Sequence, residues 1–434
     1  TFTSRNLPAI RQDEPYCWCP EDYKVQVSFD LQGTQFTPNE YKPYSQKWED
    51  VDKQLLKPEN TQFGEHLSLT NPFRPETKQA YNSEMNFEEK IICAFQVLKK
   101  KMAWNGRYQL YSKELEKVIK KGSGSNADLN FILISILKDF GLEAYPVVMS
   151  RRSSGMLPYN FPSLQKLKTF FVAIHDINKQ KYVFLDSSMD VPAFNILPLE
   201  LSVNKARMLS LKEKEEKKWV NVMALSHNKS FMKIDARIEG NQVKGHRSTV
   251  LYGQEAIEYQ ANENHKQDNL VSNPENKVSQ KEKLTVTNLK VKKQENDWAL
   301  IEEEFDFVLQ ADRTDDHLYI NPMLFPQLKS NPFIQTERVL PIEFPYPYKF
   351  TMLSTLTLPE GYEVEELPQS QSIRSEGDGL QCKYMIQQQG NTILLNYVFH
   401  LKGYIFLSEQ YKQLQELWAK VIEKNNALIV LKKI

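Results

Sequence analysis

A run of small and polar side chains precedes the most apolar helix that the sequence predicts. It reads Gly122-Ser-Gly-Ser-Asn-Ala-Asp-Leu-Asn. Unpaired backbone N–H groups and the helix dipole make the amino end of a buried helix a place where a thiolate is stabilised. A nucleophile there also needs a base, usually a histidine from a neighbouring strand, and an Asp or Asn that orients the base. The residues that could do chemistry are therefore sought at this helix and on the strands after it.

The elements that must position such residues follow from hydrophobic periodicity. The helix is predicted from apolar residues spaced i, i+3, i+4, i+7 between Leu129 and Phe140, and Gly141 is a typical stop. Two earlier helices are predicted from stripes that start at Trp48 and at Phe87. Strands are predicted at 144–149, 170–174 and 182–186. Helices followed by antiparallel strands predict an α+β domain with helices on one face of a sheet.

Three segments of this region resemble the bacterial transglutaminase-like superfamily, which has a papain-type core. They are Asn126-Ala-Asp-Leu-Asn, Gly141-Leu-Glu-Ala-Tyr-Pro-Val-Val-Met-Ser-Arg and Tyr182-Val-Phe-Leu-Asp. The flanking sequence, including Leu358-Pro-Glu-Gly-Tyr, resembles two uncharacterised β-domain families that accompany this core. The resemblance implies an α+β fold with a papain/transglutaminase-like core followed by antiparallel β-sandwich-type domains. It also implies an exported protein, which predicts a periplasmic or outer-envelope location.

The resemblance divides the chain into four parts. Residues 1–42 are predicted to be the tail of an amino-terminal β-domain, and residues 43–205 the transglutaminase-like core. The charge run 206–219 is predicted to be a solvated linker. Residues 220–434 are predicted to be β-rich, with a terminal helix over 408–425.

The family's catalytic residues transfer to this chain one by one. The family cysteine stands two residues before the Asp of the first motif, here Asp128, so Asn126 takes its place. The family histidine begins the strand near residue 170, where this chain has Thr169. The family aspartate ends the next strand as Asp186. One triad member of three therefore remains.

The loss of both the nucleophile and the base predicts a protein without catalysis. Either loss typically lowers the rate by several powers of ten. Asn126 is instead predicted to be the helix N-cap, because Asn contributes about 1 kcal/mol in that position. The resulting hypothesis is a binding or envelope assembly module. It would use the cleft that holds the catalytic residues in the family. Its candidate binding residues are Ser125, Asn126, Asp128, Tyr159, Thr169 and Asp186.

Two alternatives stay open. One is a hydrolase or transferase with a displaced site built from Ser125, Cys93 or His175, although His175 lies six residues beyond Thr169. The other is a structural scaffold in which no cleft matters and partners bind the β-domains. Both the first hypothesis and the scaffold predict a protein or peptide partner.

The sequence beyond residue 220 predicts strands, turns and a loop. Hairpins are expected around Gly240-Asn241 and Gly390-Asn391, and a mobile polar loop over 262–283. A strand is also expected at 23–30 from alternating apolar and polar residues. The prolines between Pro322 and Pro347 suit the edges and turns of a β-sandwich.

Composition argues against several classes of partner. Lys plus Arg and Asp plus Glu number 55 each, so no overall field directs the chain to nucleic acid. No apolar run is long enough for a membrane span, and the first residues do not form a signal peptide. Cys17 and Cys19 have no second pair at zinc-like spacing, so neither a metal nor a cofactor is predicted.

Overall fold

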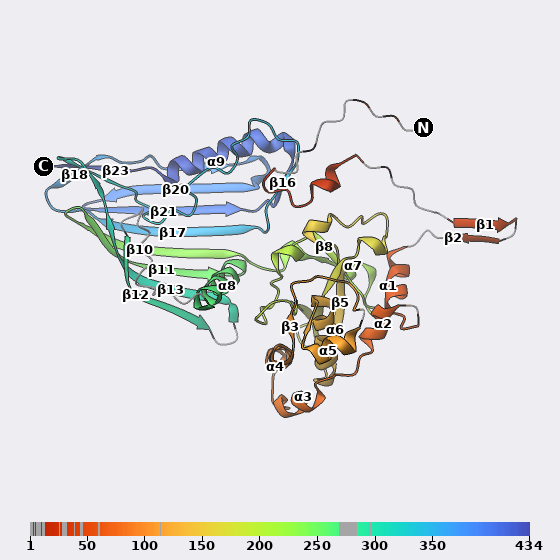
Figure 1. Cartoon of the computed structure of the whole chain (residues 1–434). Helices are drawn as coiled ribbons and strands as arrows, with labels where there is room; N and C mark the ends of the chain where they lie inside the picture. The colour runs from red at the N-terminus through yellow and green to blue at the C-terminus, as the bar shows by residue number, and fades with distance from the viewer. Residues whose placement is uncertain are drawn as a thin grey trace. The chain divides into compact units, whose positions relative to one another are not determined.

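The computed structural model describes residues 14–25, 27, 33–38, 40–43, 47–59, 61–112, 114–268, 284–294 and 297–434, together with residues 3, 5 and 10. Its contacts divide the chain into two compact units, which are described one at a time (Figure 1). Unit 1 comprises residues 1–10 and 18–226, and unit 2 comprises residues 11–17 and 227–434.

Unit 1 is a helical layer packed on an antiparallel sheet. The sheet has the strand order β7-β6-β5-β8-β9. Its strands are β5 (Glu143–Met149), β6 (Thr169–Asp176), β7 (Lys181–Leu185), β8 (Lys205–Met208) and β9 (Trp219–Asn221). The helices are α1 (Trp48–Leu56), α2 (Gln62–Leu67), α3 (Arg74–Ala80), α4 (Phe87–Lys101), α5 (Leu115–Lys121), α6 (Asn126–Asp139) and α7 (Glu215–Lys218). The α+β class predicted for this region is confirmed, whereas a papain-type core stays a prediction.

The central helix of unit 1 is α6. All residues from Asn126 to Leu137 are buried, since α6 packs on β5 and β6 on one side and on α4 on another. A helix that is apolar nearly all round belongs in such an interior position. Gly141 follows the helix with φ +74°, which is the left-handed conformation expected of its stop residue.

Two short strand pairs and a 3-10 helix complete the description of unit 1. β3 (Ala103–Trp104) and β4 (Ser123–Gly124) pair in parallel just before α6, and β1 (Gly33–Thr37) pairs with β2 (Glu40–Pro43). A short 3-10 helix occupies Pro20–Tyr23, so Tyr23 does not begin a strand. Half of the strand predicted at 23–30, residues 26 and 28–30, lies outside the described residues.

The prediction of a solvated linker over 206–219 is wrong. The segment supplies most of β8, the whole of α7 and the first residue of β9, and β8 pairs with both β5 and β9. The compact unit therefore continues to Ser226. A charge run hides this role because the partner of its buried charge, Asp52, lies far away in the sequence.

That buried charge is the guanidinium of Arg207. Its side chain is 0% exposed and forms two hydrogen bonds to Asp52, at 2.7 and 2.8 Å, and two to Glu215, at 2.6 and 2.9 Å. Lys218 adds a second cation, with Nζ donating to Asp52 at 3.0 Å. The rings of Trp48 and Trp219 lie 5.7 and 5.1 Å from the guanidinium. A buried ion pair of this kind tolerates the loss of neither partner.

We expect Asp52→Ala to lower the free energy of unfolding by about 3 kcal/mol, because Arg207 would keep a single carboxylate partner in a dry site. Denaturant unfolding followed by tryptophan fluorescence measures the change. Glu65→Ala, which removes an exposed carboxylate from α2, is the matched control and should leave stability nearly unchanged. Equal effects of the two substitutions would contradict this account of the network.

Unit 2 is dominated by one large sheet. Its strand order is β12-β13-β11-β10-β17-β21-β20-β19. The strands are β10 (Lys229–Glu239), β11 (Gln242–Tyr252), β12 (Leu284–Gln294), β13 (Asp297–Gln310), β17 (Tyr348–Thr357), β19 (Gln371–Arg374), β20 (Leu380–Gln389) and β21 (Thr392–Leu401). The predicted hairpins around Gly240 and Gly390 are present as β10/β11 and β20/β21.

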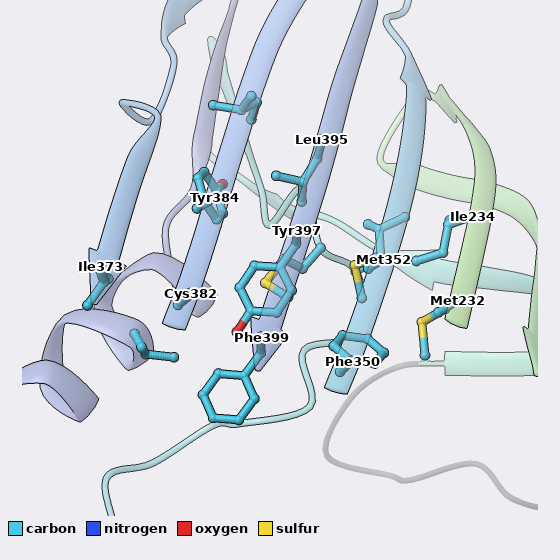
Figure 2. Packing of buried hydrophobic residues seen from close by; sticks show 14 of the residues in the cluster. Met232, Ile234, Phe350, Met352, Ile373, Cys382, Tyr384, Leu395, Tyr397 and Phe399 are labelled. Atoms are coloured by element: carbon cyan, nitrogen blue, oxygen red, sulfur yellow. The ribbon is translucent and has the colours of Figure 1, made fainter. Parts of the chain in front are cut away.

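One face of this sheet is covered. Among the described residues, the other face is not paired with a second large sheet. The covering layer contains α8 (Gln254–Asp268), α9 (Tyr411–Asn425) and a small sheet of β14 (Asp312–Arg313), β15 (His317–Ile320), β23 (Ile429–Lys433) and β18 (Tyr362–Glu366). The remaining pair is β16 (Ile342–Glu343) with β22 (Ile405–Phe406). Figure 2 shows Tyr384 and Tyr397 beside each other on neighbouring strands in the core below this layer.

The structure corrects the expected antiparallel sandwich in two respects. β10 and β17 run parallel, so the large sheet is mixed. The layer opposite it is built from helices and a small sheet. Part of the predicted loop at 262–283 is also helical, since α8 extends to Asp268, and residues 269–283 lie outside the described residues. No helix in the described ranges is both long and apolar enough to cross a membrane.

Candidate functional site

Ser125 caps the amino end of α6. Its hydroxyl accepts the backbone N–H of Asp128 at 3.3 Å and donates to the Asp128 carboxylate at 2.7 Å. The same carboxylate accepts the backbone N–H of Ser125 at 2.7 Å, which completes a capping box. The prediction that Asn126 is the N-cap is therefore wrong, because the serine one position earlier takes that role. Asn126 is the first residue of the helix.

Asn126 uses its side chain to join three elements. Its Oδ1 accepts the backbone N–H of Gln109 at 3.0 Å. Its Nδ2 donates to Thr169 Oγ1 at 2.6 Å and to the carbonyl of Phe170 at 3.1 Å, and lies 3.4 Å from Asp186 Oδ2. The three positions that the family resemblance singled out are thus adjacent in space. An amide, a hydroxyl and a carboxylate occupy them.

Asp186 is the charged centre of the cluster. It is 0% exposed, and burial raises the pKa of its carboxyl although four donors oppose that shift. Two of these donors are the side chains of Asn126 and Asn130. The Nδ2 atom of Asn130 lies 2.9 Å from Asp186 Oδ2. The other two are the backbone N–H of Ser188, at 3.0 Å from Oδ1, and the Ser188 hydroxyl. We name Asn126, Asn130, Thr169, Asp186 and Ser188 the amide–carboxylate cluster.

The cluster reaches towards solvent through Tyr108. The Tyr108 hydroxyl lies 3.3 Å from the Ser188 hydroxyl, and burial raises the pKa of this phenol. Lys99 lies on the same side, with Nζ 3.2 Å from the carbonyl of Ser187, and burial lowers its pKa. Neither side chain hydrogen-bonds to Asn126 or Thr169 among the described contacts.

The chain itself covers the cluster. Asn126, Thr169 and Asp186 are each 0% exposed, Ser125 is 1% and Asp128 4%. The cover over Asn126 is the segment around Arg107, whose carbonyl accepts the Asn126 backbone N–H at 3.1 Å. A ligand could reach these side chains only after this segment moved. In the closed state the cluster holds the loop, α6 and β6 together, and it offers neither an activated nucleophile nor an imidazole base.

Tyr159 lies elsewhere. Its carbonyl accepts Trp48 Nε1 at 2.7 Å, and its ring stands at a right angle to that of Trp219, with centroids 5.3 Å apart. It therefore belongs with the residues around Arg207. Of the six predicted binding residues, the structure brings the other five together.

The residues of the displaced-site alternative do not meet. The Cys93 thiol contacts the carbonyl of Ala80 at 3.6 Å, and burial raises its pKa. His175 stacks on Tyr182 and lies 3.5 Å from Glu143, near the end of β6 opposite to Thr169. Ser125 is engaged by Asp128. Over the described ranges, no group of three or more His, Cys, Asp or Glu side chains could hold a metal ion.

Sequence reasoning missed Asn130, Ser188 and Tyr108. Asn130 could have been found, since it lies one helical turn after Asn126 and must share its face. Ser188 follows Asp186 by two residues, a spacing at which an Asp side chain commonly accepts a backbone N–H. No sequence pattern indicates that Tyr108 is near Asp186, because its position depends on the path of the loop that follows β3.

Comparison with known proteins assigns no activity. Residues 316–431, all in unit 2, match a family model described as a domain of unknown function with a solved structure (DUF3858). A crystal structure from Parabacteroides distasonis, described as a putative protease, is 13% identical to this chain, with a TM-score of 0.48. The likeness covers 88% of this chain, which spans 57% of that chain's length. No curated protein matches.

The burial of Asp186 predicts a pH dependence of stability. A carboxyl whose pKa is higher in the folded state contributes stability below its unfolded pKa of about 3.9, and this is lost as pH rises through the folded pKa. The unfolding free energy of the unmodified protein, minus that of Asp186→Asn, should therefore decrease as pH rises across this window. Chemical denaturation at a series of pH values measures the difference. Asp190→Asn, at an exposed position, is the control and should give a flat difference.

Proposed function

We propose that this chain is a non-catalytic binding or assembly module whose amide–carboxylate cluster is a structural lock. The observation that carries the proposal is the hydrogen bonding of Asn126. Both of its polar atoms are engaged within the protein, and a buried amide in this state is a poor nucleophile. A transferase or protease of the papain type needs an activated thiolate and a base at these positions.

The energetics of the cluster also support a structural role. Removing one member would leave buried donors or acceptors unsatisfied, at a cost of about 1–3 kcal/mol for each. Buried polar groups that are all hydrogen-bonded are consistent with a structural role in which the cluster fixes a loop to a helix and a strand. A catalytic site, by contrast, must open to its substrate.

Binding is proposed to reside on unit 2. On the uncovered face of its large sheet, Lys233, Leu353 and Met385 lie on one row, from β10 through β17 and β21 to β20. They line a shallow groove of about 620 Å³, in which Leu353 is 37% and Met385 51% exposed. Apolar side chains with polar neighbours suit a protein or peptide partner. An extracytoplasmic location, expected from the family resemblance, belongs to the same proposal.

An acyl-transfer assay tests the proposal. Purified protein is incubated with a primary amine donor and with peptides, some of which contain glutamine. Mass spectrometry detects amine-linked and hydrolysed products. We expect the unmodified protein and Asn126→Ala to give the same background, because no nucleophile is lost. Turnover that Asn126→Ala abolishes would overturn the proposal. Ser123→Ala, a change beside the cluster, controls for non-specific effects.

A further inference from the structure

Residues Glu14 to Cys17 form a short segment that belongs to unit 2 although the following residues belong to unit 1. That residues 1–42 are the tail of an amino-terminal β-domain stays a prediction. We name residues 14–17 the strap. It lies against the loop between Phe333 and Phe344, more than 300 residues away in the sequence.

The acidic end of the strap is recognised through its charge. The Glu14 carboxylate accepts the backbone N–H groups of Val339 and Leu340 at 3.4 and 3.1 Å. It lies 3.6 Å from Arg338 Nε, and both side chains are 1% exposed. Arg338 also donates to the carbonyl of Pro15 at 2.5 Å. Arg338 therefore contacts both the side chain of Glu14 and the backbone of the strap.

The aromatic end of the strap is recognised through shape. Tyr16 has φ +60°, and its ring lies 5.5 Å from that of Phe333 and 5.3 Å from that of Phe344. Its carbonyl accepts the backbone N–H of Glu343 at 2.6 Å. The site therefore fits a segment with a carboxylate two positions before a tyrosine. These contacts have the composition of an ordinary peptide-recognition site, with a buried charge pair and an aromatic anchor.

We propose that the loop 333–344 of unit 2, which we name the strap site, is a peptide-recognition site that can take the Glu-Pro-Tyr strap of a second copy of this chain. The contacts are identical whether the strap comes from the same chain or from another copy, so exchange alters only the connection between units. An intramolecular strap is favoured at low protein concentration, and exchange grows with concentration. The proposal concerns unit 2 and does not depend on whether unit 1 is catalytic.

The strap site can be tested in the full chain with a labelled peptide. The probe is a synthetic peptide of residues 11–19 with serine at both cysteine positions. Glu14→Ala/Tyr16→Ala disables the strap, and this variant should bind the peptide at least about tenfold more tightly than the unmodified chain, whose own strap competes. Fluorescence anisotropy measures binding. A peptide with alanine in place of its glutamate should bind about tenfold more weakly.

Two controls keep the test independent of folding. Glu40→Ala/Tyr41→Ala removes an exposed acid–tyrosine pair from β2 and should bind the peptide no better than the unmodified chain. Circular dichroism checks that each variant is folded. If Glu14→Ala/Tyr16→Ala does not fold, the single variant Tyr16→Ala replaces it. No binding by a folded strap variant overturns the proposed site.

Exchange between copies is tested by mixing complementary variants. One chain carries Glu14→Ala/Tyr16→Ala and keeps an intact strap site, and the other carries Arg338→Ala and keeps an intact strap. Analytical ultracentrifugation should show a dimer in the mixture and monomers in each separate sample. Peptide binding without this dimer would overturn the assignment of a second copy as the partner.

Discussion

The hydrogen bonds between Asn126 and its neighbours are the contacts on which the interpretation of unit 1 depends. A buried amide must find partners for its donors and its acceptor, because an unpaired polar group in the interior costs several kcal/mol relative to water. Here the acceptor holds the loop at Gln109, and the donors hold the start of β6 and the carboxylate of Asp186. The amino end of α6 is thereby tied to β6 and to the loop before it by the chain itself.

The same constraint acts at two other places. Arg207 has no exposed surface, and it is accommodated because Asp52 and Glu215 supply four charge-assisted hydrogen bonds. Arg338 is accommodated by Glu14 and by backbone carbonyls. In each case a buried charge connects segments that are far apart in sequence. Such charges contribute specificity of assembly more clearly than stability, because their desolvation offsets much of their attraction.

Periodic elements could be predicted from the sequence, and partners of isolated polar residues could not. The spacing from Leu129 to Phe140 gave a helix because an apolar repeat depends only on local geometry, and the turns at Gly240 and Gly390 gave hairpins for the same reason. The sequence around Arg207 and Lys218 predicts a solvated run, because nothing near these residues shows that Asp52 lies opposite them. The parallel pairing of β10 with β17 could not be predicted either, because the sequence of a strand does not show the direction of the strand beside it.

The alignment of Asn126, Thr169 and Asp186 came from a resemblance, and the structure brings the three side chains together, whereas the role given to Asn126 was wrong. Helix propensity alone favours Asn at the N-cap, but Ser125 satisfies that position with Asp128 and frees Asn126 to face the sheet. An N-cap amide would have been a local device on the helix surface. An amide at the first helical position points inward, and there it links the helix to two other elements. The difference of one residue therefore decides whether this side chain stabilises a helix end or closes the whole site.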